Sequence, residues 1–297
     1  MKSDSVIACM RAFVSGDREH AVSIMRQIAA DETRSGRNLV ADKMKRLVRS
    51  ADRSGNLVAL PSKHPKVVSV YESNREMSSL VLAESVSVAM DSLFREWRHK
   101  SVLLENDVPL RQVVLLSGPS GNGKTALAEA VANELKLPVA FANYAEMISS
   151  YMGKTGSAVA SAFEFAAQNP CVLFFDEADS LCMSRTSEEG AASREQNRTV
   201  NQVLTSIDKV SQQSIVFLAT NFATQFDSAL KRRIKLEVVL DEPTDEQKVA
   251  LIELKCQQWP FLEMGPVFQL INKCKSFAEC EDVIVGVVRE HVLASCV

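Results

Sequence analysis

The sequence lacks the features that would place it in a special class of protein. Its seven cysteines form no Cys-x-x-Cys pair and its four histidines form no His/Cys cluster, which disfavours a disulfide framework or a structural zinc site. No apolar run approaches the roughly 18 residues that span a membrane, and the first ten residues are too polar for a signal peptide. We therefore expect a cytoplasmic protein with reduced thiols and no membrane association.

The sequence also lacks a strong excess of charge of one sign. Lys and Arg number 34 against 37 Asp and Glu, a net charge of −3, whereas nucleic-acid-binding proteins usually carry a basic domain. Residues 1–60 hold 11 basic and 7 acidic groups, and residues 241–297 hold 5 basic and 10 acidic groups. A nucleic-acid partner is therefore disfavoured. The basic N-terminal part fits either a site for an acidic partner or a solvated helical face.

Composition divides the 297 residues into three parts. Apolar stripes at helical spacing predict short helices within residues 1–60, which end in a linker rich in Ser, Pro and charge. Residues 61–240 contain short runs of β-forming residues with helical segments between them, the alternation that is typical of a parallel α/β sheet. Residues 241–297 read as a small helical domain. The predicted strands are residues 112–117, 138–142, 171–175, 214–219 and 235–240.

Residues 118–125 match the phosphate-binding pattern G-x-x-x-x-G-K-[ST], between a predicted strand and a predicted helix as this motif requires. Glycines let the backbone N–H groups turn towards phosphates. Lys124 can neutralise the β- and γ-phosphates, and the Thr125 hydroxyl can bind Mg²⁺. The alternative is a Gly-rich turn that only joins strand to helix. The predicted site comprises Gly118, Pro119, Ser120, Gly121, Asn122, Gly123, Lys124 and Thr125.

Polar residues follow two further predicted strands, at the edge where open α/β sheets bind ligands. Asp176 and Glu177 follow residues 171–175, and Asn221 follows residues 214–219. Asp176 is the predicted partner of the metal, and Glu177 is predicted to polarise an attacking water. Asn221 is predicted to orient that water or to sense the γ-phosphate. The alternative for the Asp176-Glu177 pair is a solvated strand end.

The motifs GPSGNGKT, FFDEAD, ATNF and DSALKRR, in this order and spacing, resemble those of the AAA+ ATPases over about residues 100–290. The resemblance implies ATP with Mg²⁺, a five-stranded parallel sheet, a C-terminal helical lid and a ring of six. Residues 276–279 stand where many AAA+ proteins carry a sensor-2 arginine, and they contain none. The implied roles are Walker A for Lys124 and Thr125, Walker B for Asp176 and Glu177, sensor 1 for Asn221, and arginine fingers for Arg232 and Arg233.

A further match indicates a narrower class within the AAA+ ATPases. Tyr151, Met152 and Gly153 follow the second predicted strand, where protein-remodelling AAA+ enzymes carry an aromatic–hydrophobic–glycine pore loop. The alternative is that Tyr151 packs inside its own domain. The chain is also similar to the pachytene-checkpoint remodellers, especially to bacterial relatives that act on HORMA-domain proteins beside nucleotide-cyclase antiphage systems.

This resemblance implies a homohexameric remodeller that threads a partner protein through its central pore, with a HORMA-domain complex as the substrate. The alternative from another class is a nucleic-acid motor or loader. Such a motor needs basic pore or lid residues, yet Lys154 is the single basic residue beside the predicted pore loop and the C-terminal part is acidic. A third alternative is an ATP-gated scaffold without turnover, which the presence of Glu177 disfavours.

Overall fold

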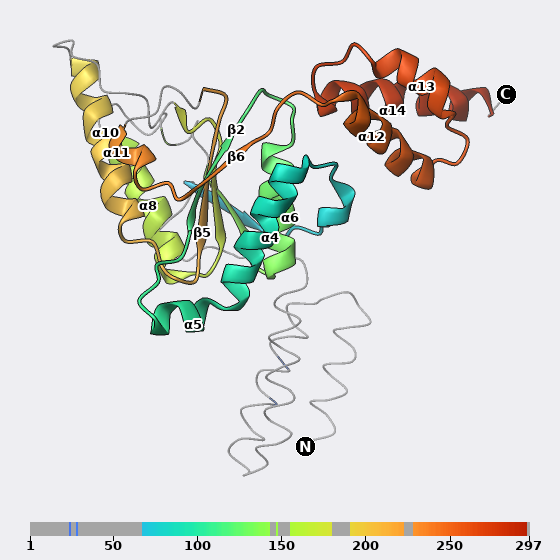
Figure 1. Cartoon of the computed structure of the whole chain (residues 1–297). Helices are drawn as coiled ribbons and strands as arrows, with labels where there is room; N and C mark the ends of the chain where they lie inside the picture. The colour runs from blue at the N-terminus through green and yellow to red at the C-terminus, as the bar shows by residue number, and fades with distance from the viewer. Residues whose placement is uncertain are drawn as a thin grey trace. The chain divides into compact units, whose positions relative to one another are not determined.

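A computed structural model describes residues 67–142, 147, 155–179, 191–222 and 228–295, together with Ile24 and Ile28 (Figure 1). Backbone contacts divide the chain into two compact units, residues 1–59 and 60–297. In the first unit, Ile24 and Ile28 are helical and Ile28 is buried. The rest of the predicted N-terminal helical region lies outside the described residues.

Among the described residues of the second unit, six strands form one mixed sheet. Five of them, β2 to β6, pair in parallel, and these are the five strands predicted from the sequence. The sixth, β1, pairs antiparallel with β3 at the edge, so the prediction of a five-stranded, all-parallel sheet was wrong by one strand. In the sheet order β1-β3-β4-β5-β2-β6, the strands are β1 (Val68–Tyr71), β3 (Val139–Ala142), β4 (Val172–Phe175), β5 (Ile215–Thr220), β2 (Val113–Ser117) and β6 (Leu236–Val239).

The missed strand β1 is short, and its sequence pattern is weak. Val68 and Val70 are buried while Ser69 between them is exposed, which is the alternation of an edge strand covered on one face. Four residues of alternation, directly after a linker-like stretch, do not stand out from their surroundings. Pairing with the buried strand β3 decides their conformation.

Helices cover both faces of this sheet (Figure 1). On one face lie α8 (Thr155–Gln168) and α10 (Ala191–Ile207), and on the other lie α4 (Glu84–Arg98) and α6 (Lys124–Leu135). Successive residues of the central strand β2 enter opposite cores. Leu115 packs in the core that α8 and α10 cover, and Leu116 packs in the core that α4 and α6 cover. Burial on both faces explains why the central strands are continuously apolar. Short helices occur at η1 (Met77–Ser79), α5 (Lys100–Glu105) and α11 (Ser228–Lys231).

Three helices follow the sheet and form a bundle with its own apolar core. They are α12 (Asp245–Gln258), α13 (Met264–Ile271) and α14 (Phe277–Ala294), and Ile252 and Ile284 are fully buried between them. We refer to α12–α14 as the C-terminal bundle. Its function as a lid stays a prediction. No helix among the described residues is both long enough and apolar enough to cross a membrane.

Candidate active site

Three central strands, β2, β4 and β5, carry the predicted site residues just beyond their ends. Lys124 begins α6 after the loop that follows β2. The Nζ atom of Lys124 donates hydrogen bonds to the carbonyl oxygens of Gly118 at 2.7 Å and Pro119 at 3.0 Å. The same atom donates to Oδ1 of Asn221, beyond β5, at 2.8 Å. The structure thus joins two predicted site residues that lie 97 positions apart in the sequence.

The ammonium group of Lys124 lies in a buried ring of oxygen atoms. Burial lowers the pKa of Lys124, and the nearby carboxylates of Asp176 and Asp179 act in the opposite direction and raise it. The residue is only 8% exposed. An ammonium group that is shielded from water and bonded to carbonyl oxygens can exchange those oxygens for the oxygens of an anionic ligand.

The backbone of the loop between β2 and α6, residues 118–123, also fits a phosphate. Gly118 has a φ of +138°, and a Cβ at this position would lie 2.0 Å from the carbonyl oxygen of Leu240. The amide of Leu240 in turn donates to the carbonyl of Ser117 at 2.7 Å, so the loop starts tightly against the chain that leaves β6. The N-terminus of α6 closes the loop, where free N–H groups favour an anion. Pro119 and Ser120 lie exposed at its tip.

The turn after β4 holds Glu177 in an unusual conformation. Glu177 is exposed and has a φ of +51°, in the left-handed region that costs a non-glycine residue about 1–3 kcal/mol. Its own amide donates to Oδ1 of Asp176 at 3.0 Å. The amide of Ala178 donates to the carbonyl of Ala219 at 2.7 Å. These bonds fix the backbone on both sides of Glu177.

A side-chain contact reinforces this turn from β5. The hydroxyl of Thr220, which is 1% exposed, donates to Oδ1 of Asp179 at 3.0 Å and accepts from the amide of Phe222 at 2.9 Å. The sequence pattern gave no role to Asp179 or Thr220, although Asp179 stands inside the motif FFDEAD and Thr220 inside ATNF. The signal was their position beside Glu177 and Asn221. Only the sheet order, with β4 next to β5, shows that they meet.

Thr125 and Asp176, the predicted ligands of Mg²⁺, are both half-buried at this edge of the sheet. Thr125 is the second residue of α6, and Asp176 lies close enough to Lys124 to raise its pKa. A hydroxyl and a carboxylate are oxygen ligands of the kind that Mg²⁺ takes. The residues present therefore fit a magnesium–phosphate ligand.

The two predicted arginine fingers lie in different surroundings. Arg233 forms a two-point ion pair with Asp208, with Nε–Oδ1 at 2.8 Å and Nη2–Oδ2 at 2.9 Å. The hydrogen bond from Arg233 lowers the pKa of Asp208. Arg232 is exposed, and its side chain makes no hydrogen bond or ion pair within the described part of the chain. The two arginines therefore differ in their surroundings, because Arg233 is held by Asp208 and Arg232 is exposed.

The predicted pore-loop residues lie outside the part of the chain that the structure describes. Tyr151, Met152 and Gly153 belong to the residues that the structure does not describe. Their assignment stays a prediction.

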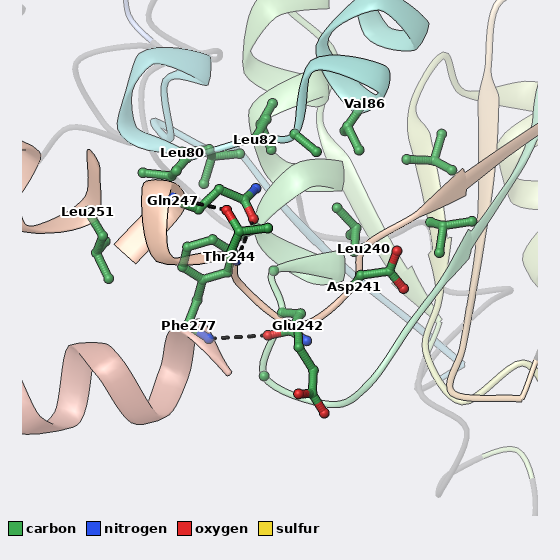
Figure 2. Close-up of a pocket in the computed structure, with 18 of the residues that line it drawn as sticks. Leu80, Leu82, Val86, Leu240, Asp241, Glu242, Thr244, Gln247, Leu251 and Phe277 are labelled. Atoms are coloured by element: carbon green, nitrogen blue, oxygen red, sulfur yellow. Dashed lines mark hydrogen bonds between the residues drawn. The ribbon is translucent and has the colours of Figure 1, made fainter. Parts of the chain in front are cut away.

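A cavity of about 410 Å³ lies beside the loop between β2 and α6 (Figure 2). Its walls come from residues 79–89, from Gly121 and Asn122 of the loop, from the chain after β6, and from the C-terminal bundle. The sequence did not predict this cavity, because its lining residues other than Gly121, Asn122 and Gly123 belong to no motif. Its size and mixed apolar and polar lining suit the nucleoside part of a ligand whose phosphates lie in the loop. Labelled lining residues in Figure 2 include Leu80, Leu82, Val86, Leu240, Thr244, Gln247 and Phe277.

Comparisons with known proteins agree with this geometry. Residues 114–242 match the family model "ATPase family associated with various cellular activities (AAA)". The chain is 30% identical over 237 residues to "Uncharacterized AAA family ATPase y4kL" of Sinorhizobium fredii, a match that covers 80% of this chain and 71% of that protein.

Two longer proteins match over a smaller share of their length. The chain is 34% identical over 170 residues to "ATP-dependent zinc metalloprotease FtsH" of Trieres chinensis, covering 56% of this chain and 26% of that protein. It is 35% identical over 189 residues to "Putative ribosome biogenesis ATPase nvl" of Dictyostelium discoideum, covering 61% of this chain and 22% of that protein. The family model and the y4kL relative, taken with the phosphate loop and the parallel sheet, decide the family. The chain belongs to the AAA family of ATPases.

Proposed function

We propose that the protein is an ATP-driven remodeller that works on a partner protein as a ring of six. The observation that carries the nucleotide site is the 2.8 Å hydrogen bond from Lys124 to Asn221. It joins the phosphate loop to the end of β5, beside the strand end that bears Glu177. A loop of this shape, a buried cation and an exposed carboxylate are the parts that phosphoryl transfer to water requires.

Each residue has a role that follows from its position. The phosphates of ATP replace the carbonyls of Gly118 and Pro119 as partners of Lys124. Glu177 polarises the attacking water, and Asn221 orients it. A Mg²⁺ ion held by Thr125 and Asp176 supplies neutralisation of the phosphate charge when it is bound.

We assign the trans-acting finger to Arg232 and a bracing role to Arg233. The exposed guanidinium of Arg232 pairs with none of the described residues, whereas the guanidinium of Arg233 is held by Asp208 of its own chain. An arginine that reaches the nucleotide of a neighbouring subunit raises the rate by about 10³–10⁵. In this proposal each catalytic site is completed by Arg232 of the neighbouring subunit, so activity requires the ring.

The proposed substrate is a HORMA-domain protein complex in a bacterial antiviral system that contains a nucleotide cyclase. Support comes from the resemblance of the motifs to pachytene-checkpoint remodellers. One similar protein, FtsH, is named as an ATP-dependent protease, which fits action on proteins. In the proposed ring, Tyr151 and Met152 grip the threaded chain, and Gly153 lets the loop bend.

The nucleotide site is tested with Lys124→Ala and Glu177→Gln. Lys124→Ala is expected to weaken ATP binding, because the phosphates lose their cation. Glu177→Gln is expected to keep ATP bound while phosphate release collapses, because an amide does not accept the proton of the water. Fluorescent-nucleotide binding and phosphate release measure the two effects. Parental turnover by Glu177→Gln contradicts the role of this residue.

The finger is tested by mixing Arg232→Ala subunits with Lys124→Ala subunits. Each variant alone is expected to be inactive. In the mixture, an intact Arg232 on one subunit can act on the intact Lys124 site of its neighbour, so activity returns. The absence of any recovery at every mixing ratio contradicts action in trans.

The substrate is tested with a purified HORMA-domain protein and the Glu177→Gln variant in ATP, which should hold the partner in the pore. Adding Tyr151→Ala to this variant should abolish the capture while nucleotide stays bound. Unfolded casein serves as the control for a non-specific grip. Stimulation of ATPase activity by DNA, with no effect of the HORMA-domain protein, would favour the nucleic-acid motor instead.

A further inference from the structure

The first turn of α14 rests directly on the phosphate loop. A helix leaves its first N–H groups without partners inside the helix. Here the amide of Phe277 donates to Oδ1 of Asn122 at 3.2 Å, and the amide of Ala278 donates to the carbonyl of Gly121 at 3.0 Å. The side chain of Ser276 accepts from the amide of Glu279 at 3.2 Å. The loop thus supplies two of the three caps of this helix.

The contact leaves little room for a side chain at position 121, and the backbone there has a conformation that favours glycine. Gly121 has a φ of +79°, and a Cβ there would lie 3.0 Å from Oγ of Ser276 and 3.1 Å from Cβ of Ala278. The backbone of the loop therefore lies against the helix end. A movement of the loop away from α14 would therefore break the caps that the loop supplies.

Asn122 contributes a second feature, a buried donor that no described residue satisfies. The residue is 3% exposed, and its Nδ2 atom finds no acceptor among the described residues, although Oδ1 is bonded to Phe277. An unpaired buried amide is costly, about 1–3 kcal/mol. Asn122 also lines the cavity beside the loop, so a ligand in that cavity could supply the acceptor that Nδ2 lacks.

We propose that Asn122 is a positioning residue that couples nucleotide binding to the C-terminal bundle. Its amide oxygen caps α14, and its amide nitrogen donates to the adenine nucleotide in the adjoining cavity. Residues 276–279, where many AAA+ proteins carry a sensor-2 arginine, contain no arginine. We assign the coupling to Asn122 in its place. The inference rests on the proposed nucleotide site and adds to it a route by which the bundle responds to occupancy.

The physical reason for the coupling is linkage. The cap opens when the loop moves away from α14, and a nucleotide that holds the loop opposes this movement. If opening requires release of the ligand, a nucleotide at one hundred times its dissociation constant makes the open state about 100-fold rarer. The coupling is reciprocal, so a loop that loses its contact with α14 also binds nucleotide less tightly.

Hydrogen exchange of the full chain at single-amide resolution, with and without ADP, tests the proposal. In the parent protein we expect ADP to slow exchange of the Phe277 amide by ten- to a hundred-fold. In Asn122→Ala, which lacks both the cap and the donor, we expect ADP to bind about tenfold more weakly and to leave exchange at Phe277 unchanged when the site is saturated.

Ser276→Ala is the matched control, because it removes a cap of the same helix turn that does not involve the loop. Its Glu279 amide should exchange faster with and without ADP, while the protection of Phe277 by ADP persists. The proposal is overturned if ADP binds the parent without slowing Phe277. It is also overturned if Asn122→Ala keeps the parental protection at saturation. Failure of the parent to bind ADP, by contrast, would contradict the nucleotide site itself.

Discussion

Replacing Thr220 by valine tests whether β5 holds Glu177 in its working conformation. The hydroxyl of Thr220 links the end of β5 to Asp179, two residues beyond Glu177. Valine has nearly the same shape but neither donates nor accepts a hydrogen bond. The substitution therefore removes the link and leaves the packing of the buried side chain largely intact.

The expected magnitude follows from two opposing terms. A hydrogen bond to a charged group contributes about 1.5–3 kcal/mol, and the left-handed conformation of Glu177 costs about 1–3 kcal/mol. Because the two terms are similar in size, loss of the bond lets Glu177 relax in most molecules. Since about 1.4 kcal/mol corresponds to a tenfold change in rate, we expect the turnover of Thr220→Val to fall by about ten- to a hundred-fold.

The assay separates positioning from folding. We expect Thr220→Val to lower kcat with little change in nucleotide affinity, because Lys124 and the loop are untouched. Thr220→Ser keeps the hydroxyl and should restore most of the turnover. Melting temperatures of both variants report any loss of packing. A Thr220→Val protein with the parental kcat would refute the argument that this hydroxyl positions Glu177.

Two further predictions concern stability. Gly118→Ala should prevent stable folding, because the new Cβ would lie 2.0 Å from the carbonyl oxygen of Leu240. Gly286→Ala, in an open position of α14, should instead stabilise the helix by about 0.5–1 kcal/mol. Urea unfolding of both variants checks this, and equal stabilities would contradict it. The Arg233–Asp208 ion pair lowers the pKa of Asp208, so it stabilises the protein above the unfolded-state pKa of about 3.9 and this stabilisation disappears as pH falls through the lower folded-state pKa. The difference in thermal stability between the parent and Asp208→Asn should therefore be present at pH 6 and shrink towards pH 3, and a difference that stays constant with pH would contradict the assignment.

Much of the fold could be predicted from the sequence because its signals are local. A strand buried on both faces must be apolar along its whole length, and the strands β2 to β5 show this as continuous runs. The phosphate loop could be predicted for a similar reason. Eight consecutive residues contain its glycines, its lysine and its hydroxyl.

Other features depend on which residues meet in space, and no local pattern encodes such pairs. The edge strand β1 exists through its pairing with β3, about 70 residues later in the chain. Arg232 and Arg233 are adjacent and equivalent in the sequence. Only the fold shows that Asp208 binds the guanidinium of Arg233. In the sequence Asn122 is one more residue of the phosphate loop, and only the fold shows its bond to Phe277, 155 residues away. The sequence by itself determined the chemistry available at the site, and the tertiary structure decided the partner of each side chain, because hydrogen bonds and ion pairs depend on distances that the fold alone sets.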